Sequence, residues 1–137
     1  SSIIGRELIG KTELVEWFLS QRGKTVSGFT KVMYSGVTTV EMAKIVTNIL
    51  QTQKDLNGIY QLASEPISKF SLLNLVNEKF NCEVEIIEES GKESDKTLDG
   101  QRFSSETGMK ISSWEHMIND LANDKVNYEE WSNNGSR

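Results

Sequence analysis

The residues that most directly suggest chemistry stand near the start of the chain. Gly5, Gly10, Lys11 and Thr12 fit the G-x-x-x-x-G-K-[ST] pattern of a loop that wraps its backbone amides around a phosphate. In such a loop the lysine reaches the phosphates and the hydroxyl ligates magnesium. Here residues 6–9 include a carboxylate and two bulky apolar groups, which would repel or crowd a triphosphate. The alternative is a glycine-bounded loop between a strand and a helix, in which Lys11 is solvated and Thr12 caps the helix. A small nucleotide-binding protein that uses Gly5, Lys11 and Thr12 therefore remains an alternative function.

Few other residues suggest chemistry. His116 is the only histidine and stands one position from a helical apolar stripe, which favours a surface position over a catalytic one. Cys82 is the only cysteine, so the sequence holds no Cys and His cluster for a metal, and Cys82 is expected to be a small buried hydrophobe. Arg102, next to Phe103, either presents its rigid guanidinium fork to a phosphate or forms an ordinary surface ion pair.

Composition narrows the class of protein. The 137 residues, of which 36% are apolar, suffice for one domain with a modest core. The net charge of -5 would repel DNA or RNA. No membrane span and no signal peptide are visible, which predicts a cytoplasmic protein without a membrane or nucleic-acid partner. The chain opens on Ser1 rather than Met, close to an apolar pair, which suggests a fragment of a longer protein.

The elements that must position these residues are expected to alternate between strand and helix, as in an α/β domain with short strands and helices packed on them. In the first half, apolar spacing and turn residues predict a strand end at 3–4 and a helix at 13–21, capped by Thr12 and ended by Gly23. Two short strands are predicted at 25–29 and 32–37, broken by Gly28 and Gly36. A second helix follows, capped by Thr38 in a capping box with Glu41. The buried side of that helix is expected to carry Val40, Ala43, Val46, Ile49 and Leu50.

The second half is predicted from the same signals. A strand is expected at 59–63, followed by a helix that Ser68 caps and that turns Leu72, Leu73, Val76 and Phe80 inward. A half-exposed strand with Val84 and Ile86 inward then leads to a polar loop at 90–101. The last helix is capped by Ser112 or Ser113, and its apolar side carries Trp114, Met117, Ile118 and Leu121. We divide the chain into a substrate-binding portion at 1–122 and a C-terminal tail at 123–137.

The order of these motifs resembles the C-terminal part of the Rossmann-type extended short-chain dehydrogenases, within them the dTDP-4-dehydrorhamnose reductase type of nucleotide-sugar reductases and epimerases. The resemblance is carried by "SIIG" at residues 2–5, "SGVTTVEMA" at 35–43, "GIYQLASEPIS" at 58–68 and "RFSSETGMKISSWEHMI" at 102–118. It runs over residues 2–122. It implies a glycine-bounded loop, residues 5–10, over a sugar-nucleotide cleft at the carboxyl end of a strand.

The chain also departs from this family. Its Gly-rich dinucleotide turn is absent, and so is its Tyr-x-x-x-Lys pair, because Tyr34, Tyr60 and Tyr128 are followed four positions later by Thr or Ser. In the family that tyrosine donates a proton to the substrate carbonyl while NADP or NAD delivers hydride. The resemblance therefore implies a chain that is not catalytic alone, binds no cofactor or metal by itself, and completes the cleft of a missing N-terminal dinucleotide-binding half.

The same resemblance implies the substrate-binding residues. Arg102 is expected at the diphosphate or ribose of a dTDP- or UDP-deoxysugar, Thr38 with the turn of Ser35 and Gly36 beside the ligand, and the loop of Gly5, Arg6 and Glu7 near the sugar. The remaining alternative is a non-catalytic interaction module, which would expose the apolar edge around residues 3–4 and form a homodimer.

Overall fold

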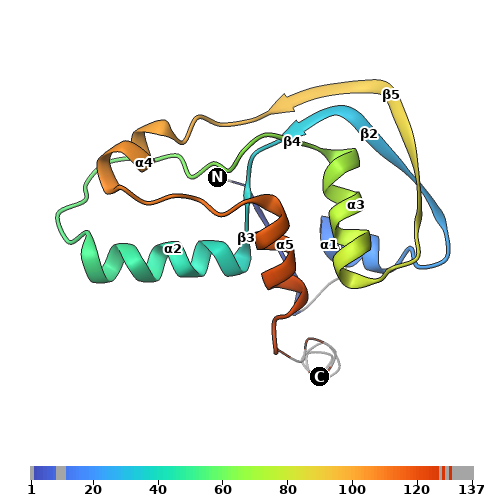
Figure 1. The fold of residues 1–137 in the computed structure, drawn as a ribbon, viewed down its shortest axis with the longest axis horizontal. Coiled ribbons are helices and arrows are strands. Elements are labelled where there is room, and N and C mark those ends of the chain that lie inside the picture. Colours follow the sequence, from blue (N-terminus) through green and yellow to red (C-terminus); the bar gives the residue numbers. More distant parts are fainter. Residues whose placement is uncertain (1, 9–11, 127, 129, 131–137) are drawn as a thin grey trace.

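The fold, seen in a computed structural model, is described for residues 2–8, 12–126, 128 and 130. Strands and helices alternate along the chain, which confirms the predicted α/β class (Figure 1). The elements are β1 (Ile3–Ile4), α1 (Leu14–Leu19), β2 (Thr25–Tyr34), β3 (Val37–Thr38), α2 (Thr39–Thr52), β4 (Ile67–Ser68), α3 (Lys69–Phe80), β5 (Glu85–Lys96), α4 (Gln101–Thr107) and α5 (Trp114–Ala122).

The strands form two small sheets. In one, β1 pairs with β3 in parallel, with Ile3 opposite Val37. In the other, β2 is the central strand, antiparallel to the short β4 and parallel to β5 along almost its whole length. The long arch of β2 and β5 runs over the outer side of α3 (Figure 1). The turn between β2 and β3 therefore joins the two sheets.

The predicted break at Gly28 is wrong, because β2 runs straight through it. A Cβ atom at Gly28 would lie 2.6 Å from Phe70 Cδ2 and 2.7 Å from Ile86 Cγ2, so glycine is needed there for the close approach of α3 and not for a turn. The predicted loop at 90–101 is also wrong at its start. Despite its polar composition, β5 continues to Lys96, because the ladder with β2 satisfies its backbone groups.

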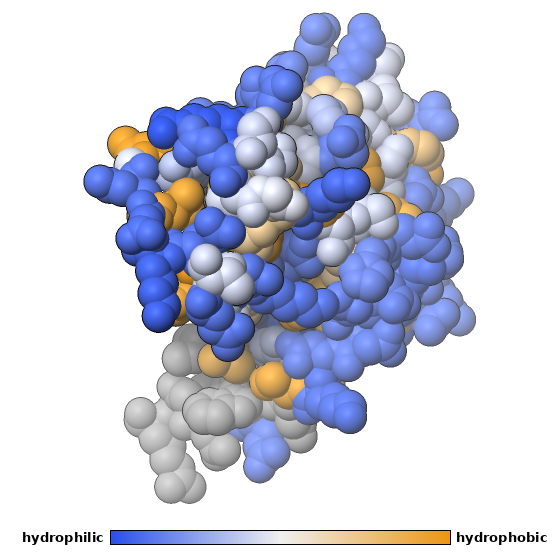
Figure 2. All heavy atoms as spheres, turned by 60° about the vertical axis from the view of Figure 1, so that its left-hand side comes forward, coloured by the Kyte–Doolittle hydropathy of each residue, from blue (hydrophilic) through white to orange (hydrophobic). Residues whose placement is uncertain are grey.

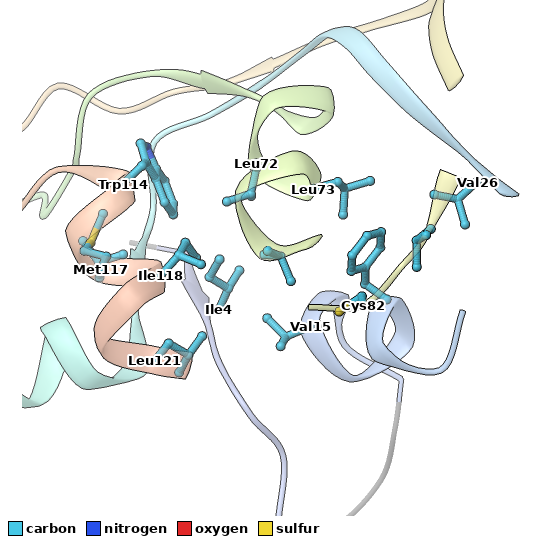
Figure 3. Close-up of a cluster of buried hydrophobic side chains, with 14 residues drawn as sticks. Ile4, Val15, Val26, Leu72, Leu73, Cys82, Trp114, Met117, Ile118 and Leu121 are labelled. Atoms are coloured by element: carbon cyan, nitrogen blue, oxygen red, sulfur yellow. The ribbon is translucent and has the colours of Figure 1, made fainter. Parts of the chain in front are cut away.

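The core lies around α3, between α5 on one side and α1 on the other (Figure 3). Most inward positions predicted for α3 and α5 are confirmed, since Leu72, Leu73, Val76 and the four apolar residues of α5 are buried. Phe80 is only partly buried against the core. Cys82 is 1% exposed within this core, as expected for a small hydrophobe. His116 lies at the surface, where it was predicted.

Three predicted helix caps are confirmed and one is wrong. The hydroxyl oxygens of Thr38, Ser68 and Ser113 each accept a hydrogen bond from a first-turn amide, an arrangement that stabilises a helix by about 1 kcal/mol. Thr12 does not cap α1. The capping position is occupied by Glu13, whose own backbone N–H donates to Glu7 Oε1 at 2.6 Å.

The buried face predicted for α2 is wrong. Val46 and Leu50 are 44% and 73% exposed, whereas Glu41 and Ile45 are buried. Glu41 does not complete the capping box. Its Oε1 instead accepts a hydrogen bond from Ser112 N at 2.8 Å, just before α5 begins, and this contact turns the Glu41 side of α2 inward.

Two further segments differ from prediction. Residues 59–63 form no strand, and Ile59 is 87% exposed. Residues 101–107 form α4, which buries Phe103, although Gln101 was assigned to the loop and no element was predicted for residues 102–107. The face that carries α2 and α4 is mostly hydrophilic, with small separate apolar patches (Figure 2). Among the described residues no helix is long and apolar enough to span a bilayer.

Candidate functional site

The loop after β1 begins at Gly5, which is packed against the first residue of α2. A Cβ atom at Gly5 would lie 2.3 Å from Thr39 Oγ1 and 2.5 Å from Thr39 Cγ2. Glycine is required here because any side chain would collide with Thr39. This packing accounts for Gly5 without a phosphate. Gly10 and Lys11 of the phosphate-loop pattern lie outside the described residues.

The next two residues of this loop are held by carboxylates. Arg6 Nε donates to Glu16 Oε1 in a partly buried ion pair, and the Arg6 guanidinium lies 4.8 Å from the centre of the Tyr128 ring. The backbone N–H of Glu7 donates to the same Glu16 oxygen at 3.4 Å, while Glu7 Oε1 accepts from Glu13 N. The loop is therefore tied to α1, and the charge of Arg6 is already neutralised by Glu16.

The three residues predicted around the β3 turn lie in the interior. Ser35 is 1% exposed and Thr38 is 0% exposed. Ser35 Oγ accepts a hydrogen bond from Leu98 N at 2.8 Å, and Thr38 caps α2. Gly36 leaves no room for a side chain, since a Cβ atom would lie 2.1 Å from the Tyr34 hydroxyl oxygen and 2.4 Å from Ser2 O. All three residues are therefore buried, and a ligand at the surface would not touch their side chains.

A cavity of about 460 Å³ lies beside this turn. Its wall includes Ser64, whose backbone N–H donates to Ser35 O at 2.9 Å and whose hydroxyl donates to Gly36 O at 2.6 Å. The rest of the wall comes from residues 98–101, from Ser104 of α4 and from the segment of Lys110 and Ile111. The volume lies within the usual range of small-molecule sites. This cavity was not predicted from the sequence. The predicted turn of residues 64–66 was the one feature of the sequence that could have pointed to it.

Arg102 lies in a second hollow, of about 440 Å³, on α4. It forms the surface ion pair considered from the sequence, with Arg102 Nε 3.0 Å from Glu106 Oε1, and its guanidinium stacks 4.6 Å from the centre of the Tyr60 ring. The Tyr60 hydroxyl donates to Glu106 Oε2 at 2.5 Å. This hydrogen bond, together with Arg102, lowers the pKa of Glu106, and the same bond raises the pKa of Tyr60.

The structure separates the predicted site residues into two groups. Gly5 touches Thr39, at the start of α2, and the turn of Ser35 and Gly36 lies close to it through the pairing of β1 with β3. Arg102 shares its hollow with Thr52, at the other end of α2. A helix of this length measures about 20 Å, so a single small group cannot touch both. Among the described residues no cluster of three metal-ligating side chains occurs.

No protein-family model matches the sequence, and no curated protein matches it closely. Solved structures do match the fold. The dTDP-4-dehydrorhamnose reductase of Bacillus anthracis, in complex with NADP, superposes with a TM-score of 0.71 at 14% identity, over 87% of this chain and 44% of that one. The dTDP-glucose 4,6-dehydratase of the same organism, in complex with NAD, gives 0.67 at 9% identity, over 97% of this chain and 45% of that one.

A third match is the UDP-N-acetylglucosamine 4-epimerase of Methanobrevibacter ruminantium in complex with UDP-N-acetylmuramic acid, with a TM-score of 0.61 at 16% identity, over 88% of this chain and 42% of that one. The chain therefore has the fold of part of the extended short-chain dehydrogenases, as the sequence motifs predicted. It spans less than half the length of each of these three enzymes.

Proposed function

We propose that this chain is the nucleotide-sugar binding portion of an NAD(P)-dependent reductase or epimerase of dTDP- or UDP-deoxysugars, and that it is not catalytic alone. The observation that supports the proposal is the shared fold. The three matched enzymes are a reductase, a dehydratase and an epimerase. Each is named after a nucleotide-linked sugar. The sequence itself carries neither a Gly-rich dinucleotide turn nor a Tyr-x-x-x-Lys pair.

A dinucleotide-binding half supplies NADP or NAD and the catalytic tyrosine in this proposal. Two features of the chain are suited to such a partner. Ile3 of β1 is 50% exposed, and β1 pairs on one side only, with β3, among the described residues. Val46 and Leu50 form the exposed apolar side of α2. The same surfaces suit a homodimer. We place the assembled protein in the cytoplasm.

The proposed ligand contacts are assigned residue by residue. We assign the sugar to the loop of Gly5, Arg6 and Glu7, whose backbone is fixed on α1. The buried turn of Ser35 and Gly36, with Thr38, forms the wall beside the ligand and acts through its backbone position. Arg102 takes a phosphate or ribose oxygen only if the ligand extends along α2, and to do so the guanidinium must release Glu106.

The test is an NMR titration of the full chain with UDP-glucose and dTDP-glucose. Saturable shifts in the amide signals of residues 5–7 and 36–39 are expected with at least one of the two. The variant Arg102→Gln reports on the second group, with Lys24→Gln, an exposed lysine before β2, as the matched control. Absence of saturable shifts in both groups contradicts the proposal. Binding of ATP with magnesium that is lost in Lys11→Ala favours the phosphate-loop alternative instead.

A further inference from the structure

A second cluster of charged and aromatic side chains, which shares no residue with the proposed sugar site, lies where α1, β2, β5 and the start of α3 meet. Lys69 Nζ lies 5.6 Å from the centre of the Phe29 ring and 5.5 Å from the centre of the Trp17 ring. Lys92 Nζ lies 5.3 Å from the centre of the same Phe29 ring. Two ammonium groups from different elements therefore converge on one aromatic side chain.

An irregularity in β5 brings Lys92 to this position. Phe29 is opposite Glu89 and Lys31 is opposite Glu93, so β5 advances four residues while β2 advances two. The extra residues form a bulge that contains Lys92. Bulges of this kind redirect a side chain and are common beside functional sites.

Neither ammonium group forms an ion pair with a carboxylate of the described residues. In the part of the chain that the structure describes, the ion pairs involve other residues, although β5 is rich in glutamate. Partial burial lowers the pKa of Lys69, and the nearby charge of Lys92 lowers it further. The aromatic rings stabilise each cation, but they do not neutralise it. The two ammonium groups repel each other, and an anion bound between them would relieve that repulsion.

We propose that Lys69 and Lys92 together bind a diphosphate group, with the ring of Trp17 beside it. Lysine ammonium groups are common phosphate ligands, and an extended anion with two charged centres can meet two ammonium groups that approach one ring from different elements. The diphosphate is either free or part of a nucleoside diphosphate, whose base could stack on Trp17. The inference does not rest on the proposed sugar site, because the two share no residue.

The experiment is a calorimetric titration of the full chain with inorganic diphosphate, without magnesium and at low ionic strength. Saturable binding to one site per chain is expected. Lys69→Met and Lys92→Met keep the unbranched side chain but remove the charge, and each should weaken binding about tenfold or more. Lys69→Arg should retain most of the affinity. Lys24→Met removes the same charge from an exposed site before β2 and should leave the affinity within about twofold.

Each outcome decides the matter. No saturable binding, or equal weakening by Lys24→Met, overturns the proposal, because the second result shows only a general charge effect. A parallel titration with UDP identifies the source of the group. If UDP binds at least tenfold more tightly than diphosphate, and Trp17→Leu reduces the affinity for UDP to that for diphosphate, the ligand is a nucleotide. If UDP and diphosphate bind with equal affinity, the ligand is the inorganic anion. The side-chain NMR signals of Lys69 and Lys92 should shift in the titration, a readout separate from the amides of residues 5–7 and 36–39 that test the sugar site.

Discussion

Gly5 is explained either by a phosphate-binding loop or by close packing against Thr39. If Gly5 serves packing, Gly5→Ala should destabilise the protein by about 1 to 3 kcal/mol, because the new methyl group overlaps the Thr39 side chain. Thr39→Ala removes the two atoms that collide most closely. The double variant should therefore be less destabilised than the sum of the two single variants, as measured by denaturant unfolding. Strict additivity would show that Gly5 is not constrained by Thr39.

The partly buried Tyr34 side chain should make the free energy of unfolding depend on pH. Burial raises the pKa of Tyr34 from 10.0 to about 12, and the nearby Ser2 side chain offsets this only in part. Among the described residues the Tyr34 hydroxyl has no hydrogen-bond partner. Between these two pKa values the unfolded chain has lost the phenolic proton and the folded chain keeps it. The folded state then binds more protons, so the free energy of unfolding falls as the pH rises.

The expected loss is at most about 2 to 3 kcal/mol once the pH exceeds both pKa values, since each pKa unit corresponds to about 1.4 kcal/mol and solvent screening weakens the effect on a partly exposed group. Guanidinium unfolding at about pH 9 and about pH 11 measures the onset of this loss. Tyr34→Phe should show a smaller decrease between the two pH values. An unchanged decrease in that variant would mean that other groups cause it.

At the scale of elements, one buried carboxylate joins two helices. Glu41, in the first turn of α2, is 5% exposed and accepts from the backbone N–H of Ser112, next to α5. Glu41→Ala leaves that N–H without a partner and should destabilise the protein by about 1 to 3 kcal/mol. Glu41→Gln keeps an acceptor oxygen and should cost less. Thermal unfolding of both variants checks the order, and an equal loss in the two would argue against the hydrogen bond.

Helix positions, caps and core faces were largely predictable from the sequence because they depend on local spacing. Ser68 and Ser113 cap the helices that they were predicted to cap, and the apolar spacing of α3 and α5 identified their buried faces. The errors arose where contacts distant in sequence decide. Gly28 resembles a strand break until Phe70 packs against it, and the apolar side of α2 was assigned inward although Glu41 finds its partner 71 residues away.

The sequence predicted the candidate site residues one by one, but it did not predict how the fold groups them. The sequence identified Arg102 as the guanidinium to consider, but it did not show that Arg102 lies at the far end of α2 from Gly5. The cluster of Lys69 and Lys92 was not predicted at all. It depends on a bulge in β5, and an irregular register leaves no periodic pattern in the amino-acid sequence.

At the scale of the whole molecule, β5 is the element on which the larger sheet depends. Besides β5, β2 pairs with only the two-residue β4 among the described strands. A chain that ends at residue 84 lacks both β5 and α5. It should therefore lose the cooperative unfolding transition of the full chain, because β2 would keep a long unpaired edge and the core would lose the four buried apolar residues of α5. Far-UV and near-UV circular dichroism with urea checks this. A sharp transition in the shortened chain would show that the sheet forms without β5.

The parallel register of β2 and β5 also constrains the order of events during synthesis. Thr25 bonds to Glu85 across 60 positions, so the ribosome makes β2 long before its main partner strand exists. Until β5 has been synthesised, the nascent chain has an unpaired strand edge beside an incomplete hydrophobic core. Such a partly folded state is prone to aggregation. Closure of so distant a ladder is also slow. We therefore expect a chaperone to protect the emerging chain from aggregation until β5 has been translated.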